Sequence, residues 1–338
     1  MTADEVALRF QASGTTRRIY KDFQRKITMD YKIPDGFIEL IKLVMKENPI
    51  TERNIPDDKK DIWFDLVWHI FLSDNRTESQ VNYVFNELVE SEILDMKNIE
   101  KIDELGLKDK MVTFIKKRIK DEDDKKITAF KTVLSNIDRI AESIISAKIF
   151  FKEQNLCKKY LEAKTSDTKT TKNFVAEISY SGIMKENPMK ITGIGPVNVI
   201  LWLHGYGKAL DQCPPSRQVS HFVEGDLENK QFDYRKRYDE EEREDNKRLA
   251  ALAVEKLTKD VVSKNIENVT VRDVQQAIWY YKSAQNLLHN SKSKKLLTPQ
   301  KLLDYLKYKG EKLTEFGDEL TDINEENNLS DDLKDFLA

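Results

Sequence analysis

The sequence predicts an all-α protein, and three observations support that prediction. The 338-residue chain has only 11 glycines and 8 prolines. β-Sandwiches and β-barrels need more of these residues for their many tight turns. Charged residues make up 34% of the chain and hydrophobic residues 39%, a balance typical of a highly charged globular protein. Apolar residues recur at spacings of three and four along most of the chain, which is the period of an amphipathic helix.

The apolar periodicity places the predicted helices in order along the chain. They are expected over residues 34–47, 62–72, 77–91, 109–120, 139–155, 245–263 and 271–289, and from residue 299 onward. Thr77 and Gln80 have the spacing of a capping box, so residues 62–91 are predicted to form a helical hairpin. The charged run DEDDKK at 121–126 and the polar run TSDTKTTK at 165–172 are predicted to be exposed loops.

Cysteine content and apolar runs favour an intracellular protein. Cys157 and Cys213 match neither a redox pair nor zinc spacing, and the opening residues MTADEVALRF lack the basic-then-apolar pattern of a secretion signal. The most apolar runs, IWFDLVWHIFL and VNVILWLHGYG, are much shorter than the roughly 20 residues that cross a bilayer. We therefore expect an intracellular location, in the cytoplasm or nucleoid or in the nucleus, and no contact with a membrane.

Charge is divided unevenly along the chain. The formal net charge is −3, but residues 317–338 hold eight carboxylates and one lysine and contribute −7, which leaves +4 for the rest. A basic body with an acidic tail suits binding to a polyanion, and a solvated surface explains it equally well. Basic residues also gather at Lys108, Lys110, Lys116, Lys117, Arg118 and Lys120. They could follow a phosphate backbone, although the acids at 121–124 make a solvated helix face the simpler interpretation.

The most informative local pattern is ITGIGPVNVILWLHGYGKALD at residues 191–211. Gly193 and Gly195 flank one residue, Pro196 suits the first turn of a helix, and an apolar segment follows. The pattern predicts a tight hairpin that leads into a buried helix. Unpaired amides at a helix start point outward with the positive end of the helix dipole, and glycines let an anion approach them closely. A DNA phosphate would fit the amides of Gly193, Gly195 and Val197, whereas taken alone the same pattern also suits a simple turn.

This hairpin resembles the helix-hairpin-helix of the DNA glycosylase superfamily that includes endonuclease III and the adenine and alkyl-base glycosylases. The resemblance continues on both sides of the hairpin, in the order that the family uses. The matching segments are Leu72, Ser73, Asp74 and Asn75 followed by Val81 and Asn82, then RIAESIISAKIFFKEQN at 139–155, PPSRQVSHFV at 214–223, and Ala277, Ile278 and Trp279. The resemblance implies a helix-hairpin-helix glycosylase-like fold, with two helical lobes, a DNA cleft between them and double-stranded DNA as the partner.

The resemblance also implies a division of the chain. An N-terminal segment over 1–57 would pack with a C-terminal helical lobe over 206–312. The helical barrel that contains the hairpin would comprise residues 58–205, and residues 313–338 would form an acidic tail.

The chain departs from the family at the two positions that carry its chemistry. Members with lyase activity have a lysine nucleophile two residues after the second hairpin glycine, where this chain has Val197. Lysine-dependent strand cleavage is therefore not expected. The family's aspartate supports positive charge on the deoxyribose as the base leaves, and it aligns with Ser216, which cannot supply that charge. Asp211 is the candidate carboxylate if its loop folds back, and a solvated loop aspartate is the alternative.

Base flipping needs further residues, which the resemblance assigns. Asn75 matches the family's amide wedge, and Arg217 is expected beside the DNA. One of four tryptophans is expected in the base pocket, although tryptophans on apolar helical stripes commonly belong to a core. These tryptophans are Trp63, Trp68, Trp202 and Trp279. No cofactor is expected, apart from a monovalent cation that the hairpin could hold, because neither the family's iron-sulfur cysteines nor a zinc spacing is found.

The C-terminal residues NNLSDDLKDFLA resemble the peptide by which repair and replication enzymes dock on the sliding clamp. The matching residues are Ser330, Leu333, Phe336 and Leu337. A disordered acidic tail that ends in a short amphipathic turn is the alternative.

The sequence therefore predicts a base-excision repair glycosylase that hydrolyses the N-glycosidic bond of a flipped, damaged base and lacks the lyase step. One alternative is a non-catalytic DNA-binding protein of the same fold, which Val197 and Ser216 favour. The other is a helical scaffold that binds proteins through its charged surface and tail.

Overall fold

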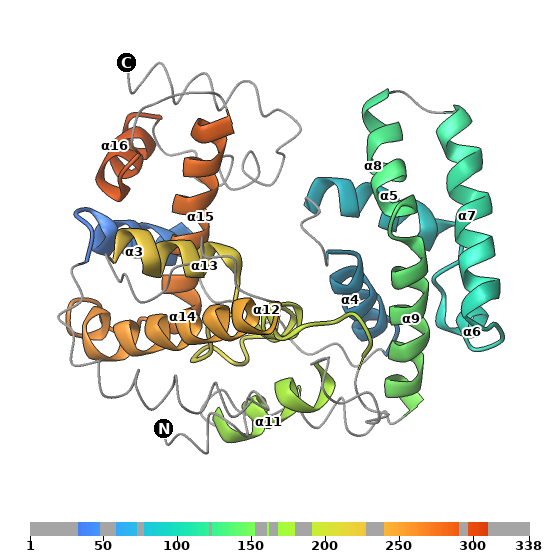
Figure 1. The fold of residues 1–338 in the computed structure, drawn as a ribbon, viewed down its shortest axis with the longest axis horizontal. Helices are drawn as coiled ribbons and strands as arrows, with labels where there is room; N and C mark the ends of the chain where they lie inside the picture. Colours follow the sequence, from blue (N-terminus) through green and yellow to red (C-terminus); the bar gives the residue numbers. More distant parts are fainter. Residues whose placement is uncertain are drawn as a thin grey trace. The chain divides into compact units, whose positions relative to one another are not determined.

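The structure, a computed structural model of the chain, describes residues 33–47, 59–72, 78–121, 124–152, 161, 168–179, 191–227, 240–290 and 297–309. Within these residues every regular element is helical, apart from one isolated β-bridge between Ser179 and Ile191 (Figure 1). The prediction of an all-α protein is therefore confirmed. None of the described helices is both long and apolar enough to span a lipid bilayer.

The chain divides into two compact units. The central unit comprises Glu52–Lys208, and the discontinuous unit combines Met1–Thr51 with Ala209–Ala338. Helix α3 near the N-terminus therefore belongs with helices from the last third of the chain.

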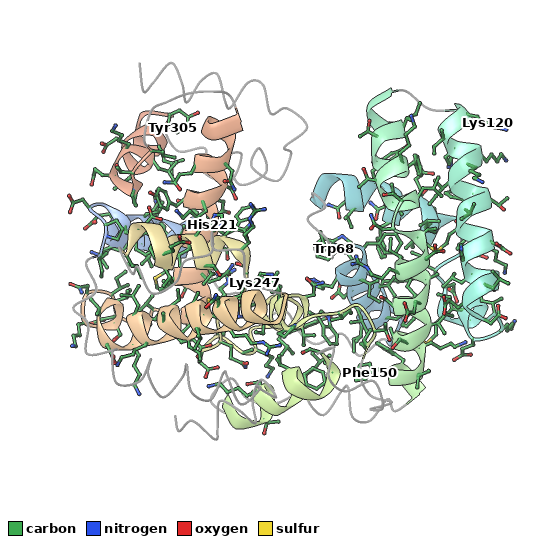
Figure 2. All side chains as sticks on the ribbon, viewed as in Figure 1. Trp68, Lys120, Phe150, His221, Lys247 and Tyr305 are labelled. Atoms are coloured by element: carbon green, nitrogen blue, oxygen red, sulfur yellow. The ribbon has the colours of Figure 1, made fainter. Side chains whose placement is uncertain are left out.

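The central unit is a helical bundle in which several of the packed pairs join helices distant in sequence. Its described helices are α4 (Lys59–Leu72), α5 (Glu78–Glu90), α6 (Met96–Ile99), α7 (Glu104–Asp121), α8 (Asp124–Leu134), α9 (Ile137–Lys152), α11 (Thr168–Ile178) and α12 (Pro196–Gly205). Helix α4 packs against α5, α9 and α12, and α7 packs against α8 and α9. Aromatic rings pack in the interior of this unit. The centres of the Phe150 ring, labelled in Figure 2, and of the Phe174 ring of α11 are 6.3 Å apart. The Phe174 ring centre is in turn 6.2 Å from that of Trp202 of α12.

The discontinuous unit is built around one apolar core. Its described helices are α3 (Phe37–Glu47), α13 (Arg217–His221), a π-helix (Phe222–Asp226), α14 (Glu240–Asp260), a 3₁₀ turn (Val262–Lys264), α15 (Val271–Asn290) and α16 (Pro299–Lys309). Helix α3 packs on both α15 and α16. The ring centres of Phe37 of α3 and Phe222 are 4.7 Å apart. The Phe222 ring also packs edge-to-face with the ring of Tyr281 of α15, at 6.4 Å between ring centres. These contacts join the N-terminal segment to the C-terminal helices.

Most of the predicted helices are confirmed, and the predicted loops are the main errors. Helix α8 begins at Asp124, inside the run DEDDKK, because composition alone does not distinguish a polar loop from the polar start of a helix. Helix α11 begins at Thr168, inside the run TSDTKTTK, and Thr171 is buried on its inner side. Helix α7 begins at Glu104 rather than near 109, since Asp103 caps it by accepting a hydrogen bond from the Gly106 amide at 2.8 Å.

Candidate nucleic-acid interface

The predicted hairpin is present at residues 191–195 and is anchored at both ends in the central unit. The Ile191 amide donates to the Ile178 carbonyl at 2.9 Å, next to the bridge with Ser179. The Ile194 amide donates back to the Ile191 carbonyl at 3.2 Å, and the Ile194 side chain is buried. One apolar side chain thus fixes the tip of the hairpin, while the flanking glycines remain partly exposed.

The backbone conformation at position 193 and the lack of space for a side chain there both require glycine. Its φ of +77° lies in the left-handed region that favours glycine. A Cβ atom on Gly193 would also lie 2.4 Å from the Oγ of Ser143 on α9. The hairpin backbone therefore packs directly on α9.

Three polar residues of α9 lie next to the hairpin. The Oγ of Ser146 accepts a hydrogen bond from the Thr192 amide at 3.0 Å. A Cβ atom on Gly193 would lie 3.6 Å from Cγ of Arg139, one turn before Ser143. Burial lowers the pKa of the Arg139 guanidinium, since desolvation disfavours the cation. The spacing of Arg139, Ser143 and Ser146 on one face of α9 is visible in the sequence, but the apolar stripe of this helix gives no sign that they face the hairpin.

Gly195 forms the start of helix α12 and has a different environment. It is the N-cap residue, with extended φ and ψ of −88° and 171°, and no atom lies within 4 Å of the position that a Cβ would take. Pro196 occupies the first helical position and donates no hydrogen bond. The amides of Gly193, Gly195 and Val197 donate to no acceptor within the described part of the chain. This start of α12 therefore offers unused donors and a positive dipole end to an anion.

Ser216 caps a helix in the discontinuous unit. It is the N-cap of α13, and its Oγ accepts a hydrogen bond from the Val219 amide at 3.3 Å. This contact explains the serine at that position structurally, without a catalytic role. Arg217 follows as the first residue of α13 and is exposed.

Asp211 lies on a loop that the discontinuous unit holds in place. The Arg272 amide at the start of α15 donates to the Leu210 carbonyl at 3.2 Å, and the Cys213 amide donates to Glu255 Oε1 of α14 at 3.1 Å. Asp211 itself is half-buried, and its Oδ1 atom is inaccessible to solvent. The loop is therefore fixed on both sides of the carboxylate, and Asp211 is not the freely solvated residue of the alternative interpretation. The sequence carries no local sign of the contacts with Glu255 and Arg272.

The four tryptophans have different environments. Trp63 is fully buried and donates from Nε1 to the Leu94 carbonyl at 2.9 Å, and Trp202 is buried among aromatic rings, so both serve as core residues. Trp279 is partly buried against the core of the discontinuous unit. Trp68 is partly exposed, and its Nε1 donates at 2.6 Å to Oδ1 of Asn82, which belongs to the segment that resembles the family. Among the tryptophans of the central unit, Trp68 is therefore the one that stays a candidate for the base pocket.

Several predicted site residues lie outside the described residues. They are the wedge residue Asn75 and the clamp-peptide residues Ser330, Leu333, Phe336 and Leu337. Within the residues that are described, His, Cys, Asp and Glu side chains form no group that could hold a metal ion.

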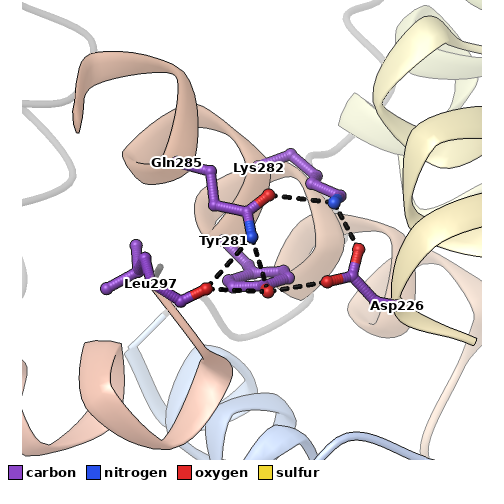
Figure 3. A network of polar contacts seen from close by, with 5 residues as sticks. All are labelled: Asp226, Tyr281, Lys282, Gln285 and Leu297. Atoms are coloured by element: carbon purple, nitrogen blue, oxygen red, sulfur yellow. Dashed lines mark hydrogen bonds and ion pairs between the residues drawn. The ribbon is translucent and has the colours of Figure 1, made fainter. Parts of the chain in front are cut away.

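A polar network that the sequence did not reveal lies inside the discontinuous unit (Figure 3). The Tyr281 hydroxyl donates to Asp226 Oδ1 at 2.7 Å, and Lys282 forms an ion pair with the other oxygen of this carboxylate. Gln285 Nε2 donates to the Tyr281 hydroxyl at 2.7 Å and to the Leu297 carbonyl at 3.1 Å, and its Oε1 accepts from Lys282 at 2.9 Å. The π-helix that follows α13 carries Asp226 into this network, so the network fixes the far end of the segment that begins at Ser216.

Comparisons of the chain with protein-family models, with curated proteins and with solved structures found no match. The likeness to the helix-hairpin-helix glycosylases therefore rests on this chain's own residues.

Proposed function

We propose that the protein binds double-stranded DNA through the 191–195 hairpin and releases a damaged base as a monofunctional DNA glycosylase inside the cell. The main support is the hairpin and the start of α12, where the amides of Gly193, Gly195 and Val197 donate to no acceptor among the described residues and Gly195 has open space beside it. Phosphate binding by backbone amides at a helix start is independent of sequence, as a lesion-searching enzyme requires. Arg139 adds a positive charge near the same hairpin.

In the proposed reaction, an activated water hydrolyses the N-glycosidic bond of a flipped nucleotide. Asp211 would stabilise the positive charge that develops on the deoxyribose as the base departs. Its fixed loop and partial burial support this role, since a preorganised carboxylate in a poorly solvated site stabilises a cation more strongly than a mobile one in water. No lyase step follows, because Val197 occupies the position of the family's lysine.

The test is base release from a panel of duplex oligonucleotides, each with one deaminated, oxidised or alkylated base. Each product is scored with and without alkali, which cleaves the strand at an abasic site. Cleavage of one member only after alkali treatment would establish a monofunctional glycosylase and identify its lesion. Duplex binding without base release from any member would favour the non-catalytic DNA-binding alternative.

Asp211→Asn tests the catalytic assignment. The substitution keeps the size of the side chain and removes its charge, so we expect base release to be lost while duplex binding persists. Glu267→Gln is the matched control, because it removes an exposed carboxylate from the same unit. Unchanged turnover in Asp211→Asn would exclude Asp211 from the mechanism.

Gly195→Asp tests whether the hairpin binds DNA at all. Aspartate is a favoured N-cap residue, and a side chain at Gly195 meets no neighbour, so the fold should persist. The new carboxylate would repel a phosphate, and duplex binding should weaken strongly, whereas Gly195→Ala should retain it. Equal binding by both variants would favour the scaffold alternative.

We also propose that the C-terminal peptide docks on the sliding clamp. The support is its pattern of Leu333, Phe336 and Leu337, which would fill an apolar pocket from a single helical turn. Substituting Phe336 and Leu337 by alanine should abolish binding to purified clamp in calorimetry while base release is retained. Unchanged binding would exclude this peptide as the docking element.

A further inference from the structure

The basic residues of α7 fall into two structural groups. Lys108 forms an ion pair with Asp138 of α9, and this carboxylate raises the pKa of Lys108. Arg118 forms an ion pair with Glu87 of α5, and its guanidinium lies 5.4 Å from the centre of the Phe114 ring. These two cations are therefore paired with carboxylates of neighbouring helices.

The other four lysines of α7 form a separate surface, which we call the lysine stripe: Lys110, Lys116, Lys117 and Lys120. All four are exposed and form no ion pair within the described residues, and Figure 2 shows Lys120 at the outer end of α7. At about 100° per residue, Lys116 and Lys120 lie opposite the fully buried residues of α7, and Lys110 and Lys117 lie on the adjoining flank. The fully buried residues are Leu107, Met111 and Ile115.

The helix itself does not account for this accumulation of charge. Cations at the end of a helix complement its dipole, but the effect is confined to the last turn, which includes Arg118 and Lys120. Lys110, Lys116 and Lys117 lie before that turn. Asp109 is the one acidic residue between 109 and 120, so the exposed charges of this segment sum to +3 once the two ion pairs are set aside.

We propose that the lysine stripe is a second DNA-binding surface, which contacts the phosphate backbone of duplex DNA without reading its sequence. From Lys110 to Lys120 the stripe is about 15 Å long, at about 1.5 Å per helical residue. Several phosphates of one strand fit within this length, since successive phosphates are about 3.4 Å apart along the duplex axis. This inference rests on the proposed function for the identity of the polyanion, and it adds a site that is separate from the hairpin.

The test compares two triple variants of the full chain that lose the same charge. Lys110→Gln, Lys116→Gln and Lys117→Gln remove three stripe lysines that form no ion pair within the described part of the chain. The control carries Lys97→Gln, Lys101→Gln and Lys264→Gln, three exposed lysines of other segments. Binding of an undamaged duplex is measured by fluorescence anisotropy at several salt concentrations.

We expect the stripe variant to show a shallower salt dependence than the control. Each lost phosphate contact should reduce the slope of log K against log salt concentration by about 0.9, so three contacts reduce it by about 2.7. Equal slopes in the two triple variants would overturn the lysine stripe as a DNA surface. Base release and its loss in Asp211→Asn are scored separately, so the proposed glycosylase activity can stand if the stripe fails. A wild-type chain that binds no duplex would overturn the stripe directly.

Discussion

The backbone of Gly193 packs directly on the Ser143 hydroxyl, and a Cβ atom at the glycine would lie 2.4 Å from Ser143 Oγ. Ser143 is itself buried on α9, so it has little room to move away. The candidate DNA-binding hairpin is thus held by close packing of two elements that are about 50 residues apart in the sequence. This contact separates the structural role of Gly193 from the binding role proposed for Gly195.

Gly193→Ala should therefore destabilise the protein. The positive φ disfavours any L side chain, and the added methyl group would collide with Ser143. Together the two effects should cost about 2–4 kcal/mol of unfolding free energy, measured by urea denaturation. Gly195→Ala is the control and should cost less than about 1 kcal/mol, since its methyl group points into open space. Equal costs for the two variants would contradict this account of the hairpin.

Lys282→Met should destabilise the protein strongly, because it leaves the largely buried carboxylate of Asp226 without its cation. Breaking a buried ion pair in this way typically costs about 3–5 kcal/mol. Lys256→Met is the matched control, since Lys256 forms a much more solvent-accessible pair with Asp260 one turn away on α14, and its loss should cost less than about 0.5 kcal/mol. Adding Asp226→Asn to Lys282→Met should cost less than the sum of the single changes. Strict additivity in urea denaturation would show that the pair is not coupled.

The Tyr281 hydroxyl should cause the free energy of unfolding to decrease at alkaline pH. Burial raises the pKa of its hydroxyl above the usual value, and the negative charge of Asp226 and the hydrogen bond to it act in the same direction. Above about pH 10 the unfolded chain loses this proton while the folded chain keeps it, so stability declines by up to about 1.4 kcal/mol per pH unit. Tyr281→Phe lacks this contribution. Its difference in unfolding free energy from wild type should be largest below about pH 10 and shrink above it. A pH-independent difference would contradict the assignment.

Sequence periodicity was sufficient for the helices whose stability comes from an apolar face. Helices α4, α5, α9, α14 and α15 were predicted because their buried residues recur with the helical period. Helices α8 and α11 start inside polar runs, and periodicity alone cannot distinguish a capped helix start from a loop. Asp103 illustrates the same limit, since its capping contact moves the start of α7 ahead of the apolar pattern.

The candidate site was predictable only where it is local in sequence. The hairpin glycines and the start of α12 follow from neighbouring residues, and the structure contains both. The supporting residues Arg139, Ser143 and Glu255 come from distant segments, so their contacts depend on tertiary packing. Trp63 lies on an apolar helix that the sequence assigned correctly, but periodicity does not distinguish a core tryptophan from one that lines a binding pocket.

Ser216→Ala should lower stability without affecting base release. Ser216 accepts the Val219 amide as the N-cap of α13, and loss of such a cap costs about 1 kcal/mol. Ser216→Asp is the control, because aspartate caps a helix as well as serine does and should restore wild-type stability. Thermal unfolding measures the cost, and base release is compared well below the unfolding temperature of the alanine variant. If Ser216→Ala instead abolished base release in a fully folded chain, Ser216 would belong to the catalytic machinery and its capping contact would not explain its presence.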